Sequence, residues 1–157
     1  MSKPTHEDLA AAASGRVQRS WSSFGMPVLE FEAAQLRPLV QQLHDQLGFK
    51  LFLDVTAVDR LPRTPRFEVV YHFLNPATHQ RIRLKTTVTE EDPTVATLTP
   101  LFGSARFMER EVHDMYGIRF AGNDDLRPIL LYEGFEGHPL RKDYPMEREQ
   151  PIVEYRK

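Results

Sequence analysis

Apolar residues recur at helical spacing in three stretches of the chain, 5–13, 36–47 and 105–116. A proline stands at or near the start of the first two stretches, where a missing N–H is tolerated. Ser104 can cap the third helix, and a glycine follows each stretch, Gly117 in the third case. The pattern therefore predicts three helices.

Other stretches alternate or are rich in β-branched residues, which predicts strands. Residues 66–74 and 81–88 alternate in character, and 75–78 between them has the composition of a turn, so this pair predicts a hairpin. Further strands are expected at 17–24, 28–31 and 51–58, the last of them buried, and a short helix is expected near 95–98. The combination predicts an α+β fold, a two-layer domain with helices packed on a mixed or antiparallel sheet.

The texture of the chain changes after Gly117. Residues 118–157 are rich in glycine and proline with little periodicity, and only 129–132 looks like a strand. The segment is too apolar and aromatic for a disordered tail, and too long for a loop inside a compact domain. We therefore expect an α+β core domain at 1–117 and, at 118–157, an extended C-terminal docking arm that orders against a partner.

Composition excludes several classes of function. Hydrophobic residues make up 41% and charged residues 27%, which is ordinary for a globular domain. A net charge of −2 provides no basic field for nucleic acid or anionic lipid. The longest apolar run, 9–13, is far too short for a direct membrane span, and the first residues lack a basic signal-peptide region. We expect a cytoplasmic chain that only other proteins could hold at a membrane.

The chain has no cysteine. Disulfides, thiol nucleophiles, thiolate zinc sites and ordinary iron–sulfur clusters are therefore excluded for this chain alone. It also lacks a Gly-x-Gly-x-x-Gly motif and a Walker loop, the recognisable devices for binding nucleotides.

The densest group of charges lies in the third predicted helix. Glu109 and His113, and Arg110 and Asp114, are spaced i,i+4 and could interact along the helix surface. One interpretation is an acid–base cluster of carboxylates and histidine. The other, which we favour, is a solvated or interfacial helix face with ion pairs. A metal site formed by His113, Asp114 and His138 has no support from spacing.

A second feature is the loop at 134–145, which combines glycines, prolines and charges of both signs. Arg141 and Lys142 could bind a substrate anion. A rigid loop that docks on a neighbouring protein is the favoured interpretation, because no nucleophile or base has a specific spacing to the loop, and arginine and tyrosine are preferred interface anchors.

These stretches resemble one family. The helix motif runs Glu109-Arg110-Glu111-x-x-Asp114-Met115-Tyr116-Gly117-Ile118 and is similar to the signature of the thirty-kilodalton subunit family of respiratory complex I, whose bacterial members are named the C subunit. Residues 125–130 and 136–145 match the same family in order and spacing, and 54–59 and 66–72 also resemble it. Phe107 stands where the family usually has tryptophan, and Asn123-Asp124 stands where it usually has His-Pro, which puts in doubt only a role for that histidine.

The resemblance implies a non-redox structural subunit in the peripheral arm of a proton-translocating NADH:quinone oxidoreductase. That enzyme passes electrons from NADH through FMN and iron–sulfur clusters to quinone, and the resemblance places these cofactors in partner subunits. It implies contacts with the large D subunit, which forms the quinone pocket, and with adjacent cluster-bearing subunits, on the cytoplasmic side of the cell inner membrane. The chain would then belong to an enzyme, a translocase, without catalytic residues of its own.

The resemblance also suggests which residues matter. Structural pairing and docking are expected of Glu109, Arg110, Glu111, Asp114, Gly117, Arg127, Gly137, His138, Pro139, Leu140, Arg141, Lys142, Asp143, Tyr144 and Pro145. Two alternatives stay open at this point. One is the equivalent subunit of a plastoquinone-type or membrane-bound hydrogenase-related complex, and the other is a small stand-alone hydrolase using Glu109, Glu111 and His138.

Overall fold

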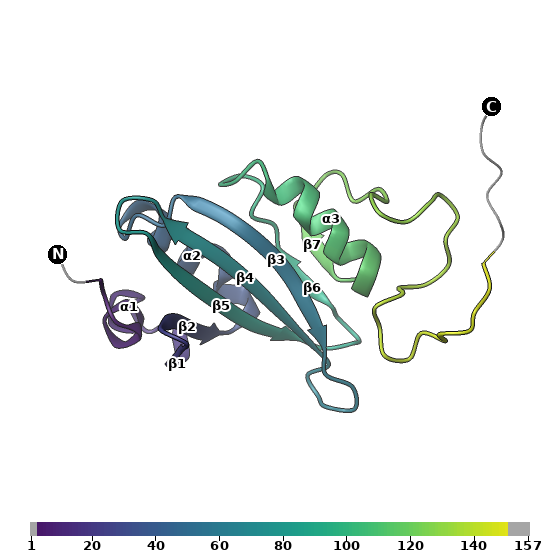
Figure 1. Ribbon diagram of the computed structural model, residues 1–157, viewed down its shortest axis with the longest axis horizontal. Helices are drawn as coiled ribbons and strands as arrows, with labels where there is room; N and C mark the ends of the chain where they lie inside the picture. Colours follow the sequence, from purple (N-terminus) through teal and green to yellow (C-terminus); the bar gives the residue numbers. More distant parts are fainter. Residues whose placement is uncertain (1–2, 151–157) are drawn as a thin grey trace.

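The computed structural model describes residues 3–150 (Figure 1). The helices and the 3-10 turn are α1 (His6–Ala12), η1 (Ala33–Gln35), α2 (Leu36–Asp45) and α3 (Ala105–Tyr116). The strands are β1 (Val17–Ser23), β2 (Met26–Phe31), β3 (Leu51–Asp59), β4 (Phe67–Asn75), β5 (Gln80–Val88), β6 (Thr94–Ala96) and β7 (Arg119–Ala121).

Five strands form one mixed sheet in the order β1-β2-β5-β4-β3. The predicted hairpin is confirmed, since β4 and β5 pair antiparallel from Phe67↔Val88 to Asn75↔Gln80. β2 joins β5 in parallel, and the other pairs in this sheet are antiparallel. The predicted α+β class with helices on a mixed sheet is therefore confirmed.

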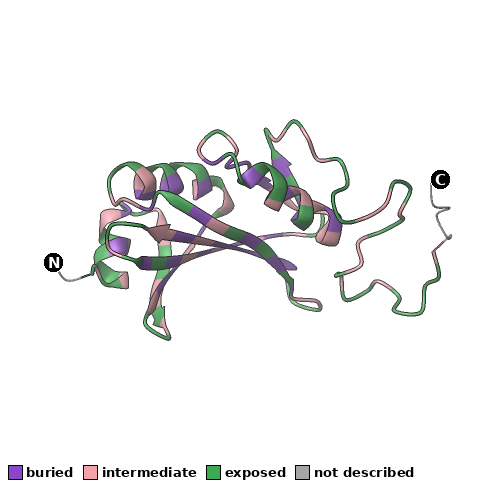
Figure 2. Ribbon diagram, turned by 45° about the horizontal axis from the view of Figure 1, so that its top comes forward, coloured by how far each residue is buried: buried purple, intermediate pink, exposed green. Residues whose placement is uncertain are grey.

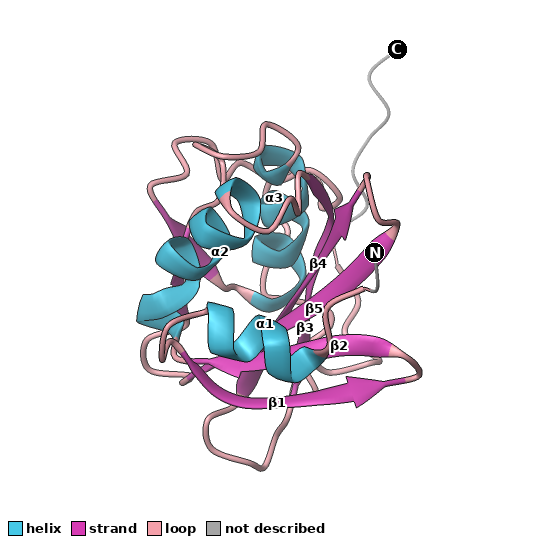
Figure 3. Cartoon of the chain, turned by 90° about the vertical axis from the view of Figure 1, so that its left-hand side faces the viewer, coloured by secondary structure: helices cyan, strands magenta, loops and turns pink. Residues whose placement is uncertain are grey.

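The helices α1, α2 and α3 lie on the same side of this sheet (Figure 3). Buried residues recur along the strands of the sheet (Figure 2), and those of β4 and β5 include Phe67, Tyr71, Phe73, Ile82 and Leu84. They pack with apolar residues of the helices into a single core. Burial of such side chains is the main favourable contribution to folding.

Local chemistry sets the helix ends. Thr5 and Asp8 form a capping box at the start of α1, in which the Thr5 side chain accepts from the Asp8 amide and the Asp8 carboxylate accepts from the Thr5 amide. Gly117 ends α3 in the left-handed conformation, with φ of 73°.

Three predictions of secondary structure were wrong. The strand at 51–58 is not buried on both faces, because alternate residues of β3, including Val58, face solvent. The region near 95–98 contains the short strand β6 in place of a helix, and β6 pairs in parallel with β7. Residues 129–132 do not form a strand, because their amides bond to a side chain of α3.

The predicted arm begins inside the core. Ile118 and Phe120 are buried there, so residues 118–121 lie with the domain that precedes them. From Gly122 to Gln150 the described chain has neither helix nor strand, and it runs beyond the end of the sheet on the side of α3 (Figure 1). We call residues 122–150 the arm. Residues 151–157, which belong to the predicted arm, lie outside the described part.

Candidate functional site

The Asp114 carboxylate binds the arm to α3. Its Oδ2 atom accepts hydrogen bonds from the amides of Ile129 (2.8 Å), Leu130 (2.9 Å) and Leu131 (3.3 Å). Asp114 is 4% exposed, so these bonds replace water around a buried carboxylate. The amides of three successive arm residues thereby converge on one side chain of the core.

Glu109 holds the start of the arm in a similar way. This fully buried carboxylate accepts from Thr97 Oγ1 (2.7 Å), the Leu98 amide (2.8 Å) and Asn123 Nδ2 (2.8 Å). Burial raises the pKa of Glu109 above its ordinary value, although the hydrogen bonds act in the opposite direction.

The predicted i,i+4 ion pairs on α3 were wrong. Arg110 donates to the main-chain oxygens of Arg127 (2.7 Å) and Pro128 (2.8 Å) instead of to Asp114. His113 Nδ1 lies 2.9 Å from the Ile118 carbonyl oxygen, so it donates there instead of pairing with Glu109. These side chains tie the helix to the chain that follows it.

The arm also closes the C-terminal end of α3. His138 Nδ1 bonds to the Asp114 carbonyl oxygen (2.9 Å), the Leu140 amide to that of Met115 (3.1 Å), and Arg141 Nε to that of Tyr116 (2.7 Å). The last carbonyls of a helix have no partner within it, so the arm supplies the missing donors. Burial lowers the pKa of His138, which favours the neutral ring with its proton on Nδ1.

Gly117 makes this closure possible for two reasons. Its positive φ favours glycine, and a Cβ at this position would lie 2.5 Å from His138 Nε2 and 2.6 Å from Arg141 Nη2. Any larger residue would therefore displace the two arm side chains that cap α3.

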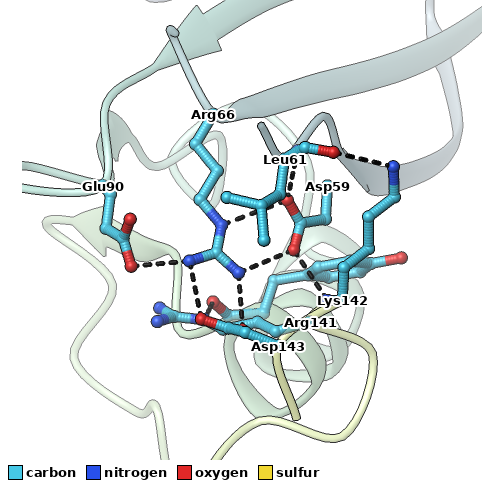
Figure 4. Close-up of polar contacts among 8 residues, drawn as sticks. Asp59, Leu61, Arg66, Glu90, Arg141, Lys142 and Asp143 are labelled. Carbon is cyan, nitrogen blue, oxygen red and sulfur yellow. Dashed lines mark hydrogen bonds and ion pairs between the residues drawn. The ribbon is translucent and has the colours of Figure 1, made fainter. Parts of the chain in front are cut away.

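Further along, the arm is fastened to the loop between β3 and β4 by a group of charges that we call the latch, Asp59, Arg66 and Asp143 (Figure 4). Arg66 binds both carboxylates with two hydrogen bonds each, at 2.8 and 3.1 Å to Asp59 and at 2.6 and 2.9 Å to Asp143. Glu90 adds a contact of 2.6 Å to Arg66 Nη1. The planar guanidinium suits such paired contacts.

Main-chain groups complete the latch. Asp59 accepts from the amides of Leu61 (2.9 Å) and Lys142 (2.8 Å), and Lys142 Nζ donates to the Leu61 carbonyl (3.1 Å) (Figure 4). Burial alone would raise the pKa of Asp59, but the bonds from Arg66, Lys142 and Leu61 outweigh it and hold that pKa well below its usual range. The carboxylate is therefore ionised at neutral pH.

Aromatic contacts stiffen the same region. The guanidinium groups of Arg66 and Arg141 each lie 5.0 Å from the ring centre of buried Phe67. Tyr144 stacks on Phe135 at 6.1 Å between ring centres. The Gly137 backbone lies close to the Tyr144 ring, so a Cβ added at this position would be only 3.0 Å from the ring.

The predicted residues divide into two groups. Nine of them come together between α3, the latch and the arm: Glu109, Arg110, Asp114, Gly117, His138, Leu140, Arg141, Lys142 and Asp143. Glu111 is exposed on α3, and the exposed Arg127 pairs with neighbouring Asp125 at 2.8 Å. Gly137 and Tyr144 lie close together within the arm, Pro139 is half-buried, and Pro145 is exposed. Whether any of them contacts a partner stays a prediction.

Sequence reasoning missed Asp59, Arg66 and Glu90 as site residues. Asp59 and Arg66 flank one loop at matching places in the hairpin of β3 and β4, where Asp59 pairs with Phe67. An acidic and a basic residue at the two ends of a strand connection were a signal for this pair. Asp143 was predicted as a docking residue, but no local pattern indicates its pairing with Arg66, which lies 77 positions away.

Several apolar side chains of the folded arm and of α3 remain in solvent. Leu130 is 60% exposed, Leu140 53% and Met146 fully exposed, with Ile129 and Phe107 of α3 also exposed. Exposed apolar side chains on a segment fixed by many hydrogen bonds are typical of a binding surface.

Within residues 3–150, no group of three His, Asp or Glu side chains could hold a metal ion. The rings of His113 and His138 lie 6.3 Å apart, and each directs Nδ1 to a main-chain oxygen. No helix in this part of the chain has the length and apolar character needed to cross a membrane.

Comparison with known proteins places these features in a family. Residues 29–150 match the family described as respiratory-chain NADH dehydrogenase, 30 Kd subunit. The chain belongs to this family. The resemblance predicted from the motifs is thereby confirmed, and the matched range includes the latch and the described arm.

Several thirty-kilodalton relatives are close in sequence. The C subunit of the NADH-quinone oxidoreductase of Sinorhizobium medicae is 47% identical over 125 residues, which is 78% of this chain and 62% of that protein. The C subunit of Hyphomonas neptunium is 45% identical over 145 residues, covering 88% of this chain and 71% of the relative. The chain thus spans less than two thirds of the Sinorhizobium protein.

Solved structures agree in fold. A trypsin-resistant fragment of Nqo5 (1–134) superposes with a TM-score of 0.62 at 33% identity, covering 67% of this chain and 86% of the fragment. A chain of an archaeal membrane-bound sulfane sulfur reductase has a TM-score of 0.77 at 23% identity, covering 90% of this chain and 84% of that chain, which shows a shared fold alone.

Proposed function

We propose that this chain is a non-redox structural subunit of the peripheral arm of a proton-translocating NADH:quinone oxidoreductase. The observation that carries the proposal is the family match over residues 29–150, together with 45–47% identity to proteins named as the C subunit of NADH-quinone oxidoreductase. The absence of cysteine supports a role without a cluster, since iron–sulfur clusters need thiolate ligands. FMN and the clusters would then reside in partner subunits.

The arm is proposed as the main docking element of the chain, with the quinone-pocket D subunit and adjacent cluster-bearing subunits as partners. Its support is physical. Asp114, Glu109 and the latch fix the arm against the chain's own core, while Leu130 and Leu140 remain in solvent. Such a prearranged apolar surface binds at a lower cost in conformational entropy than a disordered tail. A place on the cytoplasmic side of the inner membrane would follow from those partners.

The proposal is tested with a tagged full chain in cells that lack the native gene. Membranes are solubilised in mild detergent, and we expect the tag to migrate with a large assembly that oxidises NADH and reduces quinone. Two results together would refute the proposed function. The tagged chain would migrate alone, outside any large assembly, and cells lacking the gene would keep their NADH:quinone activity.

Variants of the arm test the docking role. Arg141→Ala and Asp143→Ala should lower the amount of assembled complex, because the arm loses contacts to α3 and to Arg66. Arg119→Ala is the matched control, since it removes an exposed ion pair with Asp92 of the core domain and none of the arm contacts described above. Normal assembly combined with abolished turnover in the arm variants would contradict docking.

A further inference from the structure

The outer face of the large sheet carries a line of cations along its central strand. The helices lie on the opposite face (Figure 3), and alternate residues of β5 point outward on this one. They are Arg81, Arg83, Lys85 and Thr87, and the first three are cations. The sheet register places Arg83 between Val28 of β2 and His72 of β4.

Neighbouring side chains fix these cations in position. Arg83 Nε donates to His72 Nε2 at 2.9 Å, and Lys85 Nζ donates to Glu68 at 2.9 Å. His72 is half-buried, and burial and the nearby cations lower its pKa, so it remains a neutral acceptor for Arg83. Within residues 3–150, no hydrogen bond occupies the Nη atoms of Arg83, and Arg81 has no ion-pair partner.

An aromatic side chain lies beside these cations. Trp21 of β1 pairs in the sheet with Val28, and the charged ends of Arg19 and Lys85 lie 5.8 and 5.9 Å from its ring. Tryptophan and arginine are the side chains most enriched at the energetic centres of interfaces. The face therefore combines an anchor of the kind that interfaces use with fixed positive charge.

The charge of this face is opposite in sign to that of the whole chain. The chain has a net charge of −2, but cations outnumber carboxylates on the outer face. The cations are Arg19, Arg60, Arg81, Arg83 and Lys85, and the carboxylates are Glu30, Asp54 and Glu68. Complementarity of charge favours an acidic partner.

We propose that this face, centred on Trp21, Arg81 and Arg83, is a second docking surface that binds an acidic segment of a neighbouring protein. Guanidinium groups with free Nη atoms match carboxylates in a paired geometry, and the cations along one strand form a line suited to an extended segment. A second copy of the chain would bring the same basic strand against itself. A lipid surface would meet the carboxylates of Glu30, Asp54 and Glu68 as well.

The proposal rests on the proposed function only in that the chain works inside an assembly. Its test places the photo-crosslinking residue p-benzoylphenylalanine at Trp21 in the tagged full chain, which leaves both arginines intact. The matched control carries it at Arg37, an exposed residue of α2 in the helical layer. The assembly is irradiated, and adducts are identified by mass spectrometry.

We expect an adduct from position 21 to a peptide of another subunit that is rich in Asp and Glu. Adding Arg81→Glu and Arg83→Glu should lower its yield about tenfold or more, because like charges then face each other. Arg37→Glu, added to the protein that carries the crosslinker at position 21, should leave the yield unchanged. Equal melting temperatures of the variants verify that folding is intact.

Other results would refute the docking role of this surface and leave the proposed function intact. They are no adduct from position 21 in an assembly that still contains the chain, an adduct to lipid or to a second copy, or a yield that resists charge reversal. Failure of the tagged chain to enter any NADH-oxidising assembly would instead overturn the proposed function.

Discussion

Replacing Arg66 by alanine tests the latch most directly. The Arg66 and Asp59 side chains are only 4% and 2% exposed, so Arg66→Ala leaves a buried carboxylate without its counter-charge. Asp143 and Glu90 lose the same partner, but each is half exposed and regains water.

The expected cost follows from these exposures. Removing one member of a buried ion pair costs about 3–5 kcal/mol of unfolding free energy. Asp59 keeps the amide bonds from Leu61 and Lys142, which favours the lower end of that range. The half-exposed partners each contribute roughly 1 kcal/mol or less. We therefore expect Arg66→Ala to cost about 3–4 kcal/mol, and Asp143→Ala about 1 kcal/mol, at neutral pH.

Acid should reduce the difference between Arg66→Ala and the unmodified chain. The pKa of Asp59 is lower in the folded protein than its ordinary value of 3.8. A carboxyl whose pKa falls on folding contributes stability above its unfolded pKa and loses it as pH falls toward the folded value. The cost of Arg66→Ala should therefore stay constant above about pH 5 and decrease below about pH 4.

Urea unfolding followed by circular dichroism measures the free energy, and proteolysis with trypsin reports on the arm, whose Arg141 and Lys142 become accessible if the latch opens. Arg119→Ala is the matched control, because its ion pair with Asp92 is exposed and should contribute less than about 1 kcal/mol. If Arg66→Ala costs no more than Arg119→Ala and leaves the rate of cleavage unchanged, the latch does not hold the arm.

Two further changes test the contacts of α3. Gly117→Ala should lower the free energy of unfolding in urea clearly more than Gly25→Ala. Both glycines have positive φ, but an added Cβ meets His138 and Arg141 only at Gly117. Equal losses would contradict the close approach at Gly117. Glu109→Gln should lower the unfolding free energy most at and below about pH 4.5 and less as pH rises, because the raised pKa of Glu109 means that its charged form destabilises the fold relative to the neutral form. A difference that is flat with pH would refute this.

Local sequence pattern predicted those parts of the fold that local contacts decide. The β4–β5 hairpin alternates over nine residues on each strand and is joined by turn residues, so it was found. The strands β6 and β7 have three residues each and pair across more than twenty positions, so neither shows periodicity of its own. Such short strands exist only because the surrounding core brings them together.

The candidate site shows the same division. The motif on α3 identified the correct residues, but the i,i+4 rule assigned Asp114 to Arg110. In the folded chain the Asp114 carboxylate binds the amides of Ile129 and Leu130 instead. Main-chain amides carry no side-chain signature, so spacing alone could not show that a carboxylate would bind them. For the same reason, the irregular arm was mistaken for a strand at 129–132.

The arm's closure of α3 has a consequence for the motions of the protein. The amides of Ile129, Leu130 and Leu140 are bonded to groups of α3, although they belong to a segment without helix or strand. Their exchange with deuterated solvent requires the arm to detach, and detachment also uncovers the last carbonyls of the helix. These arm amides and the last turn of α3 should therefore exchange at one common rate, as a single cooperative unit of partial unfolding.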